Sequence, residues 1–192
     1  EGAFTKSLRQ KIRDSYEEKE FGFTYSGFKK RLRERVYLNC WHRGPDDNMA
    51  MWRIYGGSNP SVAITTTVGK LTQALKHAAL PHFMSIRRVT YIKHWQDPKI
   101  DITPYSNIFA YKVRAYNYEK EVRAIIDRHE EDFDSDEMEL SMYVNVSPSQ
   151  LLRSVVFSPE APVWFKKMIR KLIRDYELDV SIKRSRLDTR PI

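Results

Sequence analysis

The sequence has little cysteine, glycine or proline, and it lacks long apolar runs. Its 192 residues include one cysteine, Cys40, so neither an internal disulfide framework nor a CxxC zinc site is available. Seven glycines and nine prolines exclude a collagen or a Gly-rich linker. No apolar run approaches the ~18 residues of a membrane-spanning helix. These absences predict a soluble, cytoplasmic protein with no membrane partner.

The familiar catalytic signatures are missing as well. The sequence contains no Walker A loop, no GxGxxG fingerprint, no HExxH and no GxSxG. Its five histidines are scattered, and none has a second His or Cys at metal-ligand spacing. We therefore expect no metal cofactor.

The chain does contain enough apolar side chains for a packed core. Hydrophobic residues make up 41% of it and aromatic residues 12%, which is typical of a globular domain and not of a disordered chain. No internal repeat, low-complexity tract or linker interrupts it. We expect one α+β domain over residues 1–192, with a mixed or antiparallel sheet of about six strands flanked by four or five helices.

Charge is unevenly distributed along the chain. The 33 Lys and Arg residues exceed the 25 Asp and Glu residues, which gives a net charge of +8. Segments 6–35 and 166–190 are basic, whereas segment 127–139 is strongly acidic. A basic balance favours nucleic acid as a partner, because neutralising phosphates drives such binding. The alternative is that these charges lie on the solvated faces of amphipathic helices, since no recognition-helix, RNP or zinc-finger signature accompanies them.

Hydrophobic periodicity and turn residues predict alternating strands and helices. The helix that begins at Ser158-Pro159-Glu160 has the strongest start signal. Its pattern places six residues on the buried side: Trp164, Met168, Ile169, Leu172, Ile173 and Tyr176. Asp46 or Asp47 could cap a helix that follows the turn near residue 45. The expected helices are 4–20, 28–35, 48–55, 68–79, 107–115 and 158–175. The expected strands are 36–41, 62–66, 86–93, 118–126, 140–146, 154–157 and 180–182.

One candidate site follows from Cys40-Trp41-His42 and the helix after it. His42 could be a general base, a ligand contact or a hydrogen-bonded structural residue. Trp52 and Tyr55, three residues apart on one helical face, could wall a pocket or belong to the core. Cys40 and His42 alternate along a strand and so share a face, which also allows a Cys–His nucleophile pair.

A second candidate site is the segment Glu119-x-Glu121-x-Arg123. In a strand these three side chains share one face. Two carboxylates and an arginine are costly to bury unless they pair or meet a polar ligand. Such a pair of glutamates could hold a ribose hydroxyl and stabilise an oxocarbenium ion. A surface strand with an ion-pair ladder, or a helix with an i,i+4 pair, explains the same pattern without a site.

Several motifs occur in a fixed order along the chain: Cys40-Trp41-His42, Met51-Trp52, Tyr55-Gly56, residues 62–66, Tyr91, Lys112, Glu119-x-Glu121-x-Arg123, Ser158-Pro159 and Ser185-x-Leu187. This ordered combination resembles a bacterial family of domains of unknown function, family two-nine-seven-one. The resemblance covers nearly the whole chain. The opening Glu1-Gly2-Ala3-Phe4 is similar to the end of the family's N-terminal stretch, so we expect an N-terminal portion to be missing.

The resemblance implies a function, although whether the chain is catalytic stays open. Members of the family are associated with phage defence, and their layout is similar to ADP-ribosyltransferase-like folds. The resemblance therefore implies NAD or a related nucleotide as ligand, with Glu121 as the catalytic carboxylate and Glu119 as its helper. A non-catalytic module that binds nucleic acid or a partner in a phage-defence system is the alternative. The implied ligand-binding residues are Trp41, His42, Trp52, Tyr55, Lys112 and Arg123.

Overall fold

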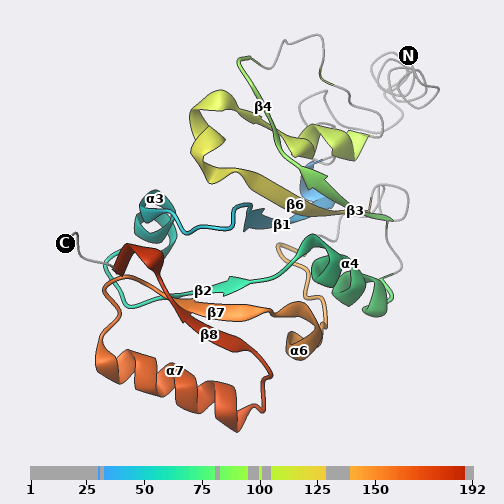
Figure 1. Ribbon diagram of the computed structural model, residues 1–192. Helices are drawn as coiled ribbons and strands as arrows, with labels where there is room; N and C mark the ends of the chain where they lie inside the picture. The colour runs from blue at the N-terminus through green and yellow to red at the C-terminus, as the bar shows by residue number, and fades with distance from the viewer. Residues whose placement is uncertain are drawn as a thin grey trace, which may run out of the picture. The chain divides into compact units, whose positions relative to one another are not determined.

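The protein has an α+β fold with mixed and antiparallel sheets, as the sequence predicts (Figure 1). A computed structural model describes residues 30, 33–80, 83–94, 100, 105–128 and 139–188. The chain divides into two compact units, which we call unit 1 (residues 1–43 and 81–143) and unit 2 (residues 44–80 and 144–192). The described strands are shared among three small sheets, two in unit 1 and one in unit 2. That the two units form one domain stays a prediction.

Unit 1 contains a three-stranded antiparallel sheet with the order β1-β6-β3 and a parallel pair β4-β5. Short 3-10 helices, η2 and η3, flank strand β5. The elements described in this unit are β1 (Val36–His42), β3 (Phe83–Arg88), β4 (Thr90–Ile92), η2 (Tyr105–Ala110), β5 (Tyr111–Val113), η3 (Arg114–Glu119) and β6 (Glu121–Asp127).

Strand β6 is the centre of unit 1. Its β-branched residues fit a central strand, and every residue from Glu121 to Ile126 is buried. The register pairs His42 with Glu121 across β1, and Arg87 with Arg123 across β3. Since both faces of β6 are covered, the charged side chains of the strand need partners inside the unit.

Two expectations for unit 1 are corrected by the pairing of its strands. The strand expected over 86–93 is two strands, β3 and β4, which separate at Val89, whose N–H donates to the carbonyl oxygen of Glu121 (3.0 Å). The helix expected over 107–115 is interrupted, because Tyr111–Val113 instead pairs in parallel with β4. Strand pairing between segments distant in sequence overrides the local helical pattern.

Unit 2 contains one mixed three-stranded sheet with the order β2-β7-β8. Strand β7 pairs antiparallel with β2 and parallel with β8. The elements described in this unit are α3 (Met49–Met51), the π-helical turn η1 (Trp52–Gly56), β2 (Val62–Thr65), α4 (Val68–His77), α6 (Pro148–Leu151), β7 (Ser154–Phe157), α7 (Val163–Asp175), β8 (Ser181–Arg184) and η4 (Arg186–Asp188).

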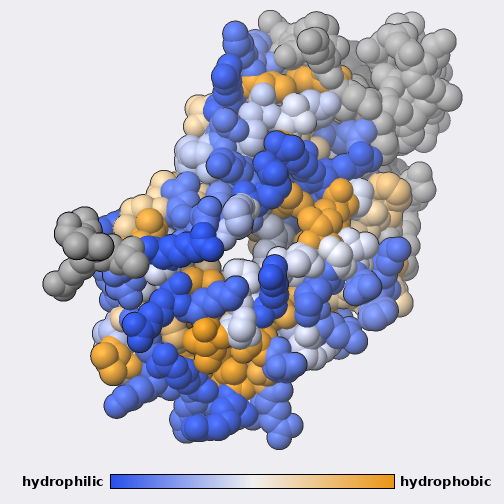
Figure 2. Space-filling view, in the orientation of Figure 1, coloured by the Kyte–Doolittle hydropathy of each residue, from blue (hydrophilic) through white to orange (hydrophobic). Residues whose placement is uncertain are grey.

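The apolar core of unit 2 lies between α7 and its sheet. Phe157, Ala161 and Phe165 are buried together, with Val62 and Ile169 packed against them. The Phe157 and Phe165 rings meet edge to face, with centroids 6.4 Å apart. In the space-filling view, apolar side chains gather between α7 and strands β7 and β8 (Figure 2). This packing fixes the helix on the sheet.

Helix α7 begins later and faces differently than the sequence predicts. Residues Ser158–Glu160 do not start the helix, which begins at Val163 with Pro162 at its N-cap position. The hydroxyl of Ser158 instead accepts a hydrogen bond from the backbone N–H of Ser61 (3.3 Å). Phe165 and Ile173 are the buried residues of α7, and Ile169 packs against the core, so the prediction is confirmed for Ile169 and Ile173 and missed Phe165. The side chains of Trp164, Met168, Leu172 and Tyr176, expected inside, are exposed.

Some of the remaining predicted elements are confirmed, and others are not. The strands near 36–41, 62–66, 154–157 and 180–182 and the helix near 68–79 are confirmed. Residues 140–146 form no strand, and no described strand pairs with them. Asn48, and not Asp46 or Asp47, caps α3 through its side chain. The helix 4–20, most of 28–35 and the acidic stretch 132–137 lie outside the described residues. Within the described ranges, no helix is both long and apolar enough to cross a membrane.

Candidate functional site

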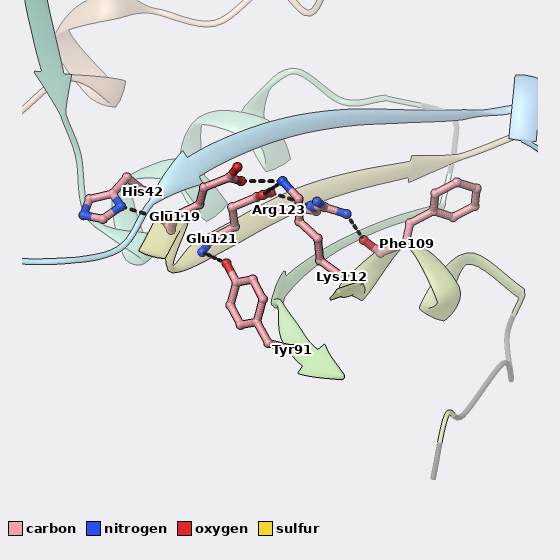
Figure 3. A network of polar contacts seen from close by, with 7 residues as sticks. All are labelled: His42, Tyr91, Phe109, Lys112, Glu119, Glu121 and Arg123. Atoms are coloured by element: carbon pink, nitrogen blue, oxygen red, sulfur yellow. Dashed lines mark hydrogen bonds and ion pairs between the residues drawn. The ribbon is translucent and has the colours of Figure 1, made fainter. Parts of the chain in front are cut away.

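Four charged side chains converge in unit 1 (Figure 3). The ammonium of Lys112, from β5, contacts Oε2 of Glu119 and lies 2.7 Å from Oε1 of Glu121. On the other side of Glu121, Nε of Arg123 lies 2.7 Å from Oε2. The two glutamate side chains are only 7% and 6% exposed, and Lys112, at 24%, is the most exposed member. We call Lys112, Glu119, Glu121 and Arg123 the charged cluster.

Backbone geometry brings the two glutamates together, although only one of them is in a strand. Glu119 is the last residue of η3, and Glu121 is the first of β6. Between them Lys120 adopts a left-handed conformation (φ 44°, ψ 52°), which changes the chain direction. Glu121 and Arg123 do share a strand face, as predicted. Glu119 reaches the same lysine from a tight turn and not by strand alternation.

Three neighbours hold the charged cluster in place. The phenol of Tyr91 accepts a hydrogen bond from the backbone N–H of Glu121 (2.9 Å). Nη1 of Arg123 donates to the carbonyl oxygen of Phe109 (2.7 Å). Nδ1 of His42 donates to the carbonyl oxygen of Glu119 (2.6 Å), which leaves Nε2 as the unprotonated nitrogen when the ring is neutral.

The two carboxyl groups differ in acidity because their partners differ. Burial alone would raise the pKa of Glu121, but hydrogen bonds from Arg123, Glu119 and Lys112 hold it well below its usual range. Burial raises the pKa of Glu119, and the neighbouring Glu121 raises it further against the opposing effect of Lys112. Glu121 is therefore the ionised member of the pair, and Glu119 is the one that takes up a proton first as the pH falls.

The same contacts act on the basic groups and on the thiol. Burial lowers the pKa of Lys112, yet its bonds to Glu119 and Glu121 outweigh this and raise it. Desolvation raises the pKa of Cys40, and Glu121 adds to that rise while Arg123 and Lys112 oppose it. A thiol with a raised pKa is a poor nucleophile at neutral pH. The arrangement thus does not favour the Cys–His interpretation.

Chemically, the charged cluster offers one fixed anion beside one carboxyl group that can exchange a proton. Carboxyl pairs whose pKa values are pushed apart are how proteins assign acid and base roles. Glu121 accepts a hydrogen bond from Lys112 on one carboxylate oxygen and from Arg123 on the other. Lys112 also lies over the ring of Tyr116, 4.6 Å from its centroid.

The structure brings some of the expected site residues together and separates others. Lys112, Glu119, Glu121, Arg123 and His42 meet in unit 1. Trp41 pairs across the sheet with Val122, so its side chain leaves the opposite face from Glu121.

Trp52 and Tyr55 both belong to unit 2. The indole of Trp52 donates to Asp47 (3.1 Å), and Tyr55 is 69% exposed. Asp47 also accepts a hydrogen bond from the buried hydroxyl of Ser185. These contacts give Asp47 and Trp52 a structural role in tying together segments of unit 2.

Sequence reasoning did not identify two contributors to the site. Tyr91 entered only through the family resemblance, yet it is the parallel-strand partner of Lys112, and both side chains act on Glu121. The carbonyl oxygen of Phe109 has no sequence signal, because any residue supplies one. A strand partner for residues 111–113 was the missing information.

The comparisons with known proteins identify no relative: no family model, no curated protein and no solved structure matches this chain. In the part of the chain that the structure describes, no group of three or more His, Cys, Asp or Glu side chains is arranged to hold a metal ion.

Proposed function

We propose that the protein is an ADP-ribosyltransferase-like enzyme that binds NAD or a related nucleotide and acts on its N-glycosidic bond. The observation that carries the proposal is the pair Glu119 and Glu121, bridged by Lys112, with their pKa values displaced in opposite directions. Loss of nicotinamide leaves positive charge on the ribose, and a fixed anion beside that carbon stabilises the transition state.

In this mechanism the two carboxyl groups have separate roles. Glu121 stays ionised and faces the developing oxocarbenium ion. Glu119 holds a ribose hydroxyl, which its carboxyl group can do as donor or acceptor. Arg123 and Tyr91 position Glu121 through its carboxylate and its backbone N–H. His42 positions Glu119 through the backbone carbonyl. The chain's own contacts thereby preorganise both groups before substrate arrives.

The test is NAD turnover by the full chain and by Glu121→Gln. Release of nicotinamide should fall by about 10²–10³-fold in the variant, the loss typical of removing one transition-state contact. Binding of NAD should change far less, because the amide keeps the shape of the carboxylate. Glu160→Gln is the matched control, since Glu160 is 80% exposed and makes only a 3.6 Å ion pair. No turnover by the wild type with any acceptor, or equal turnover by wild type and Glu121→Gln, would contradict the proposal.

A second candidate function is the binding of nucleic acid or of an acidic partner by unit 2. Helix α7 exposes basic side chains, and the edge strand β8 adds Lys183 and Arg184. Titrating duplex DNA against the protein at several salt concentrations tests it, because each phosphate contact steepens the loss of affinity with salt. An affinity that does not change with salt would exclude phosphate contacts. The basic residues on α7 are Lys166, Lys167, Arg170, Lys171 and Arg174.

A further inference from the structure

Two arginines stand side by side on the sheet face that carries the charged cluster. Arg87 of β3 and Arg123 of β6 are direct cross-strand partners, so their side chains leave the same face. Glu121 lies two residues before Arg123 on that face. Like charges directly opposite one another are destabilising in a sheet unless something anionic lies between them.

The two guanidinium groups differ in their burial and in their bonding partners. Arg123 is buried and bonded to Glu121 and Phe109. Arg87 is exposed, and within the described ranges its side chain forms no ion pair or hydrogen bond. Around the rung of Arg87 and Arg123, the cations are Lys112, Arg123 and Arg87 and the carboxyl groups are those of Glu119 and Glu121. Asp127, the other carboxylate on this face of β6, lies four residues farther along the strand. Within the described ranges, Arg87 is the cation of this group that no carboxyl group contacts, and it is open to solvent.

We propose that Arg87 binds a phosphate group of the nucleotide whose ribose is held at Glu119 and Glu121. This inference rests on the proposed function, because it adds a phosphate position to that site. The rung that holds Arg87 and Arg123 lies two residues from the rung of Glu121, which is about 6.6 Å along a strand. A ribose separates the glycosidic bond of a nucleotide from its first phosphate, so one ligand can span both rungs. Arginine's planar fork suits phosphate oxygens, and a phosphate there would offset the repulsion between the two arginines.

The next residue of the same strand supplies a matched control. Arg88 pairs with Val122, so its side chain leaves the opposite face of the sheet. It is exposed like Arg87 and has the same chemistry. Replacing either arginine by glutamine changes the net charge of the protein equally. Only the face on which the charge lies differs.

The experiment measures binding of ADP and of adenosine to the full chain by calorimetry. Arg87→Gln should weaken ADP binding by about tenfold to a hundredfold, the loss expected for one charge-assisted hydrogen bond, and leave adenosine binding unchanged. Arg88→Gln should leave both unchanged. Arg87→Lys should lie between wild type and Arg87→Gln, because it keeps the charge but not the fork. Circular dichroism and thermal melting establish that each variant is folded.

The outcomes separate this inference from the proposed chemistry. Equal weakening by Arg87→Gln and Arg88→Gln would overturn the inference, since it would reduce the effect to net charge. Wild-type protein that binds ADP no more tightly than adenosine would overturn it too. Arg87-dependent ADP binding in a protein that never releases nicotinamide from NAD would support the phosphate position and contradict the proposed function.

Discussion

The ammonium of Lys112 lies 2.7 Å from Oε1 of Glu121, and the same nitrogen contacts Glu119. One cation thus bridges two buried carboxyl groups that come from different elements, and Arg123 supplies a second cation to Glu121. Removing one member of such a buried network leaves charges without compensation, and that costs more than the intact network contributes. The stability of unit 1 should therefore depend strongly on this one lysine.

The first prediction concerns Lys112→Gln. We expect it to lower the free energy of unfolding at pH 7 by about 3 kcal/mol, because Glu119 and Glu121 lose their shared cation. This is the lower end of the cost of breaking a buried pair, since the Lys112 side chain is 24% exposed. Urea denaturation followed by circular dichroism measures the change. Lys171→Gln is the control: Lys171 pairs with Asp175 on an exposed face of α7, where such a pair contributes about 0.3–0.5 kcal/mol. Similar losses of stability in the two variants would contradict the proposal that the charged cluster contributes more to stability than an exposed ion pair.

The second prediction is a pH dependence of opposite sign for the two glutamates. The pKa of Glu121 is lowered on folding, so its contribution to stability is complete above the unfolded pKa near 4.5 and is lost as the pH falls toward the folded value. The pKa of Glu119 is raised, so its contribution is present below pH 4.5 and is lost as the pH rises through its folded pKa.

These signs can be measured with amide variants at several pH values. Glu121→Gln should reduce the loss of stability in acid below pH 4.5. Glu119→Gln should flatten the decline that begins above pH 4.5, since the amide does not titrate. Urea denaturation between pH 3 and pH 8 gives both slopes. If Glu119→Gln changes the pH dependence of the unfolding free energy only below pH 4.5, the assignment of the two pKa directions is wrong.

The third prediction follows from the orientation of α7. Phe165→Ala should lower the free energy of unfolding by about 3–4 kcal/mol, because it empties the position packed against Phe157. Trp164→Ala should lower it by no more than about 1 kcal/mol, since Trp164 is 61% exposed. Denaturation of both variants under one set of conditions is the measurement. A larger loss of stability in Trp164→Ala than in Phe165→Ala would show that α7 buries Trp164, as the sequence pattern predicts.

Local pattern was enough for part of the fold and of the site. The composition of 36–41 and 118–126 predicts strands, and alternation places Glu121 with Arg123. The second strand begins only at Glu121, because Arg114–Glu119 forms the 3-10 helix η3. The signal fails where a distant segment decides the structure. Residues 140–146 alternate like a strand, but no described strand pairs with them.

The rest of the charged cluster depends on contacts that no local pattern encodes. Glu119 reaches Lys112 only because Lys120 adopts a left-handed conformation, which is uncommon for a lysine and has no sequence marker. Lys112 reaches both glutamates because 111–113 pairs in parallel with β4, against a helical local pattern. The sequence could name these residues as candidates, but only tertiary pairing brings them together.

The last prediction uses Cys40 as a reporter of the charged cluster. Cys40 pairs with Arg123 across the sheet, and its thiol responds to Glu121, Arg123 and Lys112. Glu121→Gln removes an anion that raises the pKa of the thiol and leaves the two cations that lower it. The thiolate fraction at pH 7.5 should rise, and alkylation by iodoacetamide should accelerate about threefold to tenfold.

The opposite change is expected from the lysine. Lys112→Gln removes a cation that lowers the pKa of Cys40, so alkylation should slow even though this variant is the less stable protein. That direction separates electrostatics from loosening of the fold, because a loosened fold reduces the desolvation that raises the pKa of the thiol and so accelerates alkylation in both variants. Rates are followed by mass spectrometry in the native buffer, with Glu160→Gln as the variant expected to match wild type. Acceleration in both Glu121→Gln and Lys112→Gln would show that local unfolding, and not the charges around Cys40, controls its reactivity.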